Sequence, residues 1–172
     1  MDNRNLTLLT DLYQLTMMNG YFNYDKKDEI AVFDVFFRQN DMITYSLACG
    51  LEQVVDYVLN LHFGKEEIDY LESLGVFSKQ FLDFLAGFKF SGDIYAVPEG
   101  TVVFPGEPIM TVKAPIIEAQ LVETAILNML NFQTLIATKS AKINYAAKGD
   151  VVMEFGLRRA QAPDAGIYGA RA

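Results

Sequence analysis

The feature that most constrains this fold is a long, largely apolar stretch in the second half of the chain. From Pro115 to about Lys148, only five side chains carry a charge. They are Glu118, Glu123, Lys139, Lys142 and Lys148. A helix that is apolar nearly all round is buried, because none of its faces favours water. We therefore expect a buried central helix, or a broken pair of helices, in this stretch.

A second helical pattern lies near the N-terminus, over residues 6–18. Its apolar face carries Leu8, Leu12 and Leu15. Asp11 and Gln14 fall on the opposite face, and Gly20 marks the end of the pattern. This periodicity predicts an amphipathic helix that packs against another part of the protein.

One strand and three short helices are expected in the next part of the chain. β-Branched and aromatic side chains dominate residues 30–37, which predicts a buried strand. The amphipathic helices are expected at residues 51–63, 66–74 and 78–88. Ser78 is a suitable N-cap, because its hydroxyl can accept a hydrogen bond from a backbone N–H that has no partner within the helix.

Short strands dominate the following part of the chain. Three of them alternate with turns that contain Pro and Gly, and this pattern predicts a small antiparallel β unit. They are expected at residues 93–97, 101–104 and 109–112. A later apolar run at 151–155 is typical of a buried strand of parallel type. The sequence thus predicts an α+β domain over residues 1–148 and the beginning of a second domain at 149–172.

Composition limits the partners and the compartment that we expect. Fourteen Lys and Arg oppose 22 Asp and Glu, so the net charge of −8 argues against nucleic acid or an anionic membrane as a partner. Every apolar stretch is interrupted before the length of about 18 residues that a membrane span needs. Cys49 is the single cysteine and cannot form an internal disulfide, which indicates a reducing, cytoplasmic setting.

Two arginines directly after the last expected strand are the strongest chemical signal. Gly156 separates that strand from Arg158 and Arg159, so their guanidinium groups would lie at the carboxyl end of a strand, where α/β folds place ligands. A guanidinium donates two parallel hydrogen bonds to a phosphate or carboxylate. Taken alone, a pair of charged residues is more typical of a solvated surface, and the pattern leaves both interpretations open.

Four segments spread over the whole chain carry further motifs. They are residues 8–17, 95–108, 131–139 and 154–164. Their motifs include Asp-Leu-Tyr-Gln, Pro-Glu-Gly and Gly-Leu-Arg-Arg. In order and spacing, these segments resemble the N-terminal part of the nicotinate phosphoribosyltransferases.

That resemblance implies an enzyme of NAD salvage. It would join nicotinate to 5-phosphoribosyl-1-pyrophosphate (PRPP), releasing nicotinate mononucleotide and pyrophosphate, with coupled hydrolysis of ATP and participation of Mg²⁺. The implied fold is an α+β N-terminal domain with a small antiparallel β unit, followed at 149–172 by the first strand of an irregular α/β barrel. The implied assembly is a head-to-tail homodimer with its sites at the subunit boundary.

The resemblance also implies roles for single residues. Tyr13 would stack on the pyridine ring in the partner subunit's site, although its position is equally suited to flanking the apolar face of its own helix. Phe155 matches a ring-stacking phenylalanine of the related nicotinamide enzyme, and Arg158 matches its phosphate-binding arginine. Arg159 belongs to the pattern of the nicotinate enzymes, and a second cation near the substrate carboxylate would favour the acid over the amide.

Thr138, Lys139 and Asp164 are weaker candidates for substrate binding. Thr138 and Lys139 would lie near the phosphates, although a lysine in an apolar helix more often extends its ammonium group to solvent. Asp164 would position a ribose hydroxyl or the metal-bound pyrophosphate, although Ala-Pro-Asp-Ala-Gly is also typical of an ordinary turn. No metal ligand can be identified in the sequence.

His62 and Cys49 are not expected to be catalytic. His62 lies at the end of an expected helix, where an imidazole usually caps the helix or is partly buried. Cys49 has no histidine partner except His62, so a nucleophilic pair is not expected. The catalytic residue stays unknown, because the histidine that is phosphorylated in the resembled family lies in the barrel, beyond residue 172.

Members of the resembled family are more than twice as long as this chain. We therefore expect the chain alone to be inactive, as a fragment, a subunit of a split enzyme or a degraded product. The alternative is a non-catalytic carrier or interaction domain that retains the fold. The turns at residues 95–112 resemble those of lipoyl and biotinyl carriers, but that segment contains no lysine for acylation.

Overall fold

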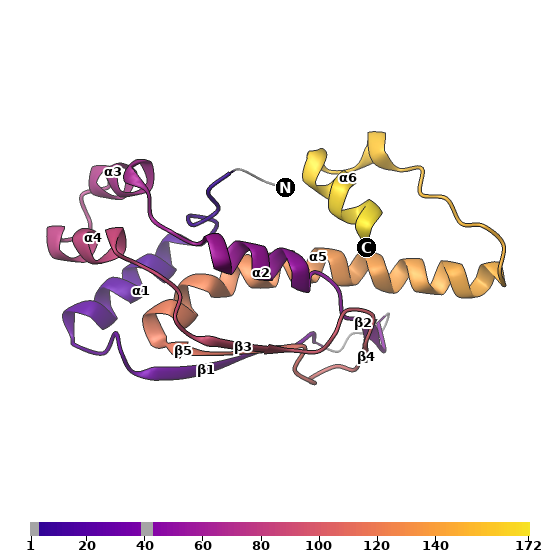
Figure 1. The fold of residues 1–172 in the computed structure, drawn as a ribbon, viewed down its shortest axis with the longest axis horizontal. Coiled ribbons are helices and arrows are strands. Elements are labelled where there is room, and N and C mark those ends of the chain that lie inside the picture. Colours follow the sequence, from indigo (N-terminus) through magenta and orange to yellow (C-terminus); the bar gives the residue numbers. More distant parts are fainter. Residues whose placement is uncertain (1–3, 39–42) are drawn as a thin grey trace. The chain divides into compact units, whose positions relative to one another are not determined.

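The computed structural model describes residues 4–38 and 43–172, with the elements labelled in Figure 1. The chain forms two compact units, and each draws on three separate stretches of sequence. The first unit contains the residues up to Phe33, Val54–Tyr95 and Thr111–Ile126. The second contains Asp34–Gln53, Ala96–Met110 and Leu127–Ala172. The division expected at residues 148 and 149 stays a prediction.

Helices α1, α3 and α4 lie wholly within the first unit. Their bounds are Leu12–Asn23, Lys65–Ser73 and Lys79–Ala86. Five further elements begin in one unit and end in the other or at its limit. These are β1 (Ile30–Val35), α2 (Leu51–Asn60), β3 (Asp93–Ala96), β5 (Met110–Pro115) and α5 (Ile116–Ala147). Strands β1, β5 and β3 form one three-stranded sheet in that order.

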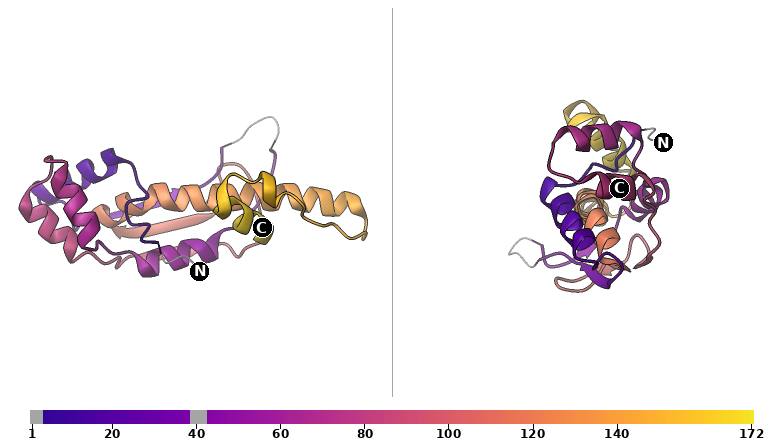
Figure 2. Two further views of the ribbon diagram at one scale, coloured as in Figure 1. Left: turned by 90° about the horizontal axis from the view of Figure 1, so that it is seen from above. Right: turned by 90° about the vertical axis from the view of Figure 1, so that its left-hand side faces the viewer.

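Aromatic and aliphatic side chains of α1, α3 and α4 contribute to the core of the first unit, together with buried residues of β5 and the first part of α5. Helices α3 and α4 pack side by side, as Figure 2 shows. Phe81 of α4 is completely buried, and its ring centre lies 5.6 Å from that of Phe22 on α1. Met18 and Leu71 are also completely buried. Burial of such side chains contributes about 1.5–3 kcal/mol each, so this cluster is a main source of the unit's stability.

Helix α1 begins later and ends later than its sequence predicts. Side chains of Asn5 and Thr7 both donate hydrogen bonds to the carbonyl oxygen of His62, at 3.0 and 2.7 Å. These bonds keep the preceding backbone out of the helix, which starts at Leu12. Gly20 does not end the helix, which continues to Asn23 although glycine within a helix costs about 0.5–1 kcal/mol relative to alanine.

The buried face of α1 also differs from the expected one. Leu12 is exposed, whereas Gln14, Leu15 and Met18 are buried. Of the expected apolar face, Leu15 is buried, Leu8 is half-buried before the helix begins, and Leu12 is exposed. The side-chain amide nitrogen of the buried Gln14 donates to Glu123 of α5 at 3.0 Å, whereas its amide oxygen has no hydrogen-bond partner among the described residues.

The three short helices are confirmed as α2, α3 and α4, with slightly different bounds. Ser78 is the N-cap of α4, as expected, and its hydroxyl accepts a hydrogen bond from the N–H of Phe81 at 3.3 Å. The strand expected at 30–37 is present as β1 but is not buried. Ile30 and Val32 are exposed, because β1 is an edge strand of its sheet.

The strands expected at 93–97, 101–104 and 109–112 are present, but they do not form a single unit. Strands β3 and β5 share the sheet of β1. The middle strand, β4 (Val102–Val103), pairs antiparallel with β2 (Ser46–Leu47) in the second unit. Its partner lies far upstream, which a local pattern does not reveal. A fold of helices and small antiparallel sheets is confirmed, but this grouping of strands is wrong.

The long apolar stretch forms one uninterrupted helix, α5, as expected (Figure 1). Its first half is mostly buried, up to Leu130. Its second half is not buried all round, because Leu135, Ile143 and Tyr145 are exposed. The expectation of a wholly buried helix is therefore only half correct. Within residues 4–38 and 43–172, no helix combines the length and apolar character needed to cross a membrane.

The segment after α5 contains no strand. Residues 151–155 have no regular secondary structure, and Val151, Met153 and Phe155 are highly exposed. The expected buried strand is wrong for this structure, since no strand among the described residues pairs with it and its backbone groups are left to bond with water. The chain continues into a short 3₁₀ helix, η1 (Leu157–Arg159), and helix α6 (Ala162–Arg171).

Two glycine substitutions test the packing of the first unit. A Cβ at Gly92 would lie 2.3 Å from the Cβ of Ala114 and 2.7 Å from the Lys113 carbonyl oxygen, so we expect Gly92→Ala to lower the free energy of unfolding by about 1–3 kcal/mol. Gly20 lies inside α1 with no atom within 4 Å of such a Cβ. Gly20→Ala is therefore expected to raise it by about 0.5–1 kcal/mol. Urea unfolding measures both, and equal effects would contradict this account of the packing.

Candidate functional site

Tyr13 occupies the first turn of α1 in the first unit, with 54% of its surface exposed. Its ring does not belong to the core, which leaves a flat aromatic face available for stacking. The hydroxyl oxygen accepts a hydrogen bond from the side-chain amide of Gln14 at 3.0 Å. About half of the Tyr13 surface is covered within its own unit, and its role in a partner's site stays a prediction.

Gln14 connects Tyr13 to helix α5. Its buried amide nitrogen also donates to a carboxylate oxygen of Glu123 at 3.0 Å. The carboxylate in turn accepts a weaker bond from Gln120 at 3.4 Å. Sequence periodicity placed Gln14 on the polar face and missed this role, because the partner residue lies 109 positions away.

Residues 155–159 of the second unit, which we call the arginine segment, bring Phe155 and Arg158 together. The guanidinium carbon of Arg158 lies 5.9 Å from the ring centre of Phe155, which is within the range of a cation–π contact. Arg159 follows in the same 3₁₀ turn, and all three side chains are exposed. The structure therefore presents an aromatic ring and two guanidinium groups on one short, accessible segment.

Helix α6 supports this segment from the C-terminal side. A Cβ at Gly166 of α6 would lie only 2.5 Å from a methyl carbon of Leu157, so glycine allows the 3₁₀ turn to pack closely on the helix. Asp164 lies in the first turn of α6 and is exposed. The alternative interpretation of this stretch as an ordinary turn is wrong, because Pro163 is tolerated in the first turn of a helix.

Thr138 and Lys139 differ sharply in their surroundings. The Thr138 hydroxyl is buried, where it donates to the Thr134 carbonyl oxygen at 2.6 Å and accepts from the Leu47 N–H at 2.9 Å. These bonds attach β2 to α5. They give the buried hydroxyl of Thr138 one donor and one acceptor within the protein. Lys139 is exposed on α5, as expected for a lysine that extends to solvent.

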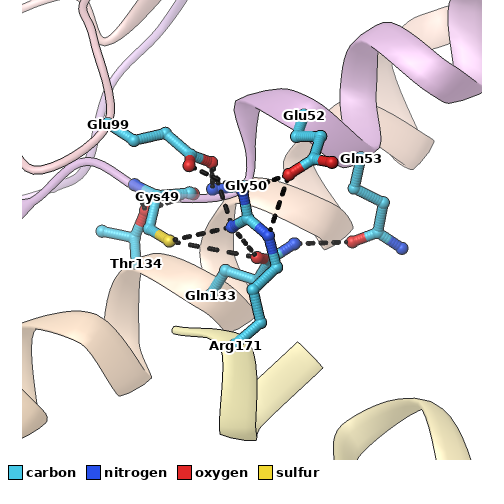
Figure 3. A network of polar contacts seen from close by, with 8 residues as sticks. All are labelled: Cys49, Gly50, Glu52, Gln53, Glu99, Gln133, Thr134 and Arg171. Carbon is cyan, nitrogen blue, oxygen red and sulfur yellow. Dashed lines mark hydrogen bonds and ion pairs between the residues drawn. The ribbon is translucent and has the colours of Figure 1, made fainter. Parts of the chain in front are cut away.

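A polar network around Arg171 was not anticipated from the sequence (Figure 3). One guanidinium nitrogen of Arg171 donates to Glu99 at 2.7 Å and a second to the other oxygen of Glu99 at 3.2 Å. The group also donates to Glu52 at 2.7 Å and to the side-chain oxygen of Gln133 at 2.9 Å. Hydrogen bonds to both carboxylates raise the pKa of Arg171 above its ordinary value.

Glu99 is itself anchored to the backbone. One of its oxygens accepts a hydrogen bond from the N–H of Gly50 at 2.7 Å. Burial opposes ionisation of Glu99, but the bonds from Arg171 and Gly50 outweigh it, so the pKa of this carboxyl lies below its ordinary value. A sequence signal for this network was Gln133 within a largely apolar helix, because a buried amide requires hydrogen-bond partners.

His62 is exposed, whereas Cys49 is buried. The His62 ring lies just beyond α2, with Nδ1 2.7 Å from the Asn60 carbonyl oxygen. The same residue helps to line an open groove of about 890 Å³ in the first unit. Cys49 is buried, and burial together with repulsion from Glu99 raises the pKa of its thiol, although Arg171 opposes the shift.

The predicted site residues divide between the two units. Tyr13 belongs to the first, and the arginine segment with Asp164 belongs to the second. Among residues 4–38 and 43–172, no group of three or more His, Cys, Asp or Glu side chains could hold a metal ion.

Comparison with known proteins identifies the family. Residues 8–131 match the family described as the nicotinate phosphoribosyltransferase N-terminal domain. The chain belongs to the nicotinate phosphoribosyltransferase family. It is 46% identical over 165 residues to nicotinate phosphoribosyltransferase pncB2 of Mycobacterium tuberculosis, covering 95% of this chain and 35% of that protein. Over 168 residues, it is 43% identical to nicotinate phosphoribosyltransferase of Bacillus subtilis, covering 97% of this chain and 34% of the relative.

The fold agrees with this nicotinate phosphoribosyltransferase assignment. The crystal structure of human nicotinic acid phosphoribosyltransferase superimposes with a TM-score of 0.85 at 32% identity, over 94% of this chain and 33% of the human chain. The chain spans about a third of the length of the curated relatives it matches. The recognition made from the four sequence segments is confirmed.

The environment of Cys49 makes a testable prediction about its chemistry. Because the thiol pKa is raised by burial and by Glu99, we expect the inflection of the alkylation rate to lie at a higher pH in the folded chain than in a cysteine-containing peptide. The rate with iodoacetamide is measured from pH 7 to 10, with the chain in urea as the control. An inflection at or below that of the peptide would contradict the buried, acid-facing environment.

Proposed function

We propose that this chain contributes the N-terminal part of an enzyme that transfers a phosphoribosyl group from PRPP to nicotinate. The products would be nicotinate mononucleotide and pyrophosphate, with coupled ATP hydrolysis, in NAD salvage. The similarity to nicotinate phosphoribosyltransferases over nearly the whole chain supports this proposal. The single cysteine favours a cytoplasmic location.

The arginine segment is the observation that carries the proposal. Phe155 supplies an aromatic face and Arg158 a guanidinium group 5.9 Å from it, which suits a ligand that joins a flat heterocycle to a phosphorylated sugar. Stacking on an aromatic ring and a bidentate bond to phosphate are different interactions that such a ligand satisfies together. Both arginines of η1 are exposed and therefore accessible to such a ligand.

Arg159 is proposed to select the acid over the amide. Nicotinate carries a carboxylate, which is costly to place in a dry site unless a cation pairs with it. The guanidinium of Arg159, next to Arg158, would pair with that carboxylate. Nicotinamide has no carboxylate and would leave the guanidinium unpaired. Asp164 is proposed to accept a hydrogen bond from a ribose hydroxyl, since it lies exposed just after the arginine segment.

Tyr13 is proposed to complete the site of a second copy of this protein in a homodimer. Its hydroxyl accepts a hydrogen bond from Gln14, and 54% of its surface is exposed. A ring that is oriented by a hydrogen bond and keeps an exposed face is well suited to a partner's ligand. Stacking on the pyridine ring would bury this exposed face.

The catalytic contribution of the chain would be positioning and charge stabilisation. Transfer at the anomeric carbon is proposed to be dissociative, so the arginines would stabilise the phosphate charges and hold the nicotinate nitrogen in line. Mg²⁺ and ATP are implied by the family, but the described residues form no ligand set for a metal ion. No step of the proposal passes through a metal held by this chain.

Residues 151–155 are proposed to form the first strand of a barrel when further strands are available. Their exposed apolar side chains are Val151, Val152, Met153 and Phe155. A nearly continuous apolar run is typical of a parallel strand that is buried on both faces. The alternative of a carrier module is disfavoured, because its characteristic turns join strands that lie in two different sheets.

Arg158 provides the sharpest mutational test of the proposed function. In a protein of the relatives' length that carries this sequence, Arg158→Ala should cost about 2–4 kcal/mol of transition-state stabilisation, measured as kcat/KM for PRPP. Arg158→Lys should recover little, because an ammonium cannot reproduce a bidentate fork. Lys148→Ala removes an exposed cation of the same unit and is the matched control. Near-normal activity of Arg158→Ala would contradict the phosphate-binding role and leave Arg158 as a residue of the solvated surface.

Tyr13 predicts complementation between subunits. Mixed dimers of Tyr13→Ala and Arg158→Ala chains of that length should regain one intact site each, because the two defects then fall in the same site of the pair. Both substitutions leave the buried Leu15 and Met18 in place, so the helix is expected to fold. Activity in verified mixed dimers is compared with that of each variant alone. No gain would remove the shared site from the proposal.

A further inference from the structure

Arg171 lies where three distant parts of the second unit meet. Its partners come from the turn after β3, the beginning of α2 and the second half of α5 (Figure 3). Glu99 and Gln133 belong to two of the segments that carried the family resemblance. The structure shows them bonded to Arg171 at 2.7 and 2.9 Å. The function proposed above makes no use of either residue.

Helix α6, which ends at Arg171, depends on contacts with the rest of its unit. It has ten residues, and isolated helices shorter than about 12–15 residues are marginal in water. Its glycine-rich face passes close to α5, since a Cβ at Gly169 would lie 3.7 Å from Phe132. Glycine contributes little apolar surface, so the polar contacts of Arg171 are the strongest attachment at this end of the helix.

The other end of α6 carries the arginine segment. Leu157 packs on Gly166, and Arg158 and Arg159 follow Leu157 in the same 3₁₀ turn. Displacement of α6 would therefore displace both guanidinium groups. A site that recognises phosphate requires its donors to be held in place before the ligand arrives.

We propose that Arg171 is a positioning residue, which docks α6 through Glu99 and so fixes the arginine segment. The significance of this role for PRPP rests on the function proposed above, whereas the docking itself does not. Arg171 touches no reacting group in this account and acts through α6. In this role, Glu99 and Gln133 hold the C-terminal end of α6 through Arg171.

Glu99 is the main partner and Glu52 a secondary one. Both oxygens of Glu99 receive bonds from the guanidinium, and the N–H of Gly50 fixes one of them. The Glu99 side chain is 30% exposed, against 69% for Glu52. Exposed ion pairs contribute little to stability, whereas a bidentate and partly buried pair is stronger and more directional.

Amide hydrogen exchange of the 172-residue chain tests the proposal without any ligand. In Arg171→Gln, amides of α6 and of residues 157–160 should exchange about tenfold faster or more, while those of α3 and α4 should be unchanged. Lys148→Gln removes one cation from the same unit and is the control. Exchange of α6 within twofold of the original chain, or acceleration throughout both units, would overturn the proposal.

Two further measurements separate positioning from general stability. Glu99→Gln should accelerate the same amides, and adding it to Arg171→Gln should have little further effect, because both act through one contact. The side-chain Nε–H signal of Arg158, which lies over Phe155, should move in the spectrum of folded Arg171→Gln. The proposal would be contradicted if the effects of the two substitutions on α6 exchange were additive, or if the Arg158 signal did not move. Arg158→Ala should leave α6 exchange unchanged, because Arg158 takes no part in docking the helix. The exchange experiment contains no PRPP, so failure of the proposed phosphate-binding role would not alter its outcome.

Discussion

Helix α5 provides hydrogen-bond partners on which both units depend. In the first unit, the carboxylate of Glu118 accepts bonds from the backbone and the hydroxyl of Ser91, at 2.6 and 2.8 Å. In the second, the hydroxyl of Thr134 bonds to both the N–H and the carbonyl oxygen of Cys49. Loops that lack regular structure are thereby fixed by side chains of one rigid helix.

The turn at Gly50 shows how closely the second unit is built on α5. A Cβ at this position would lie 3.0 Å from the Met129 carbonyl oxygen and 3.3 Å from the Leu130 Cα, and the backbone φ of +107° also favours glycine. This approach brings the N–H of Gly50 to Glu99 and places Cys49 beside Gln133. The polar network around Arg171 therefore depends on α5 being continuous at this point.

Much of the fold was predictable, because the patterns that specify it are local. The length of α5 follows from its scarcity of charge, and Ser78 marks the beginning of α4 through a bond to a residue three positions away. The start of α1 was not predictable, since it is set by Thr7 bonding to a carbonyl 55 positions away. The pairing of β4 with β2 was missed for the same reason.

The candidate site shows the same division. Phe155 and Arg158 lie close in the sequence, so their cation–π contact could be expected from their spacing. The partners of Arg171 lie 38, 72 and 119 positions away, and no periodicity relates them. Residues 151–155 were expected to be a strand from composition alone, but strand formation also requires a neighbouring strand.

The central claim is that the arginine segment is a preformed phosphate site, and the side-chain Nε–H signals of the five arginines test it directly. On titration of the chain with PRPP, the account predicts saturable shifts at Arg158 and Arg159. The signal of Arg171 should stay in place, because Glu99 already occupies its donors. Absence of a shift at Arg158 at millimolar PRPP, or shifts confined to other arginines, would contradict the account.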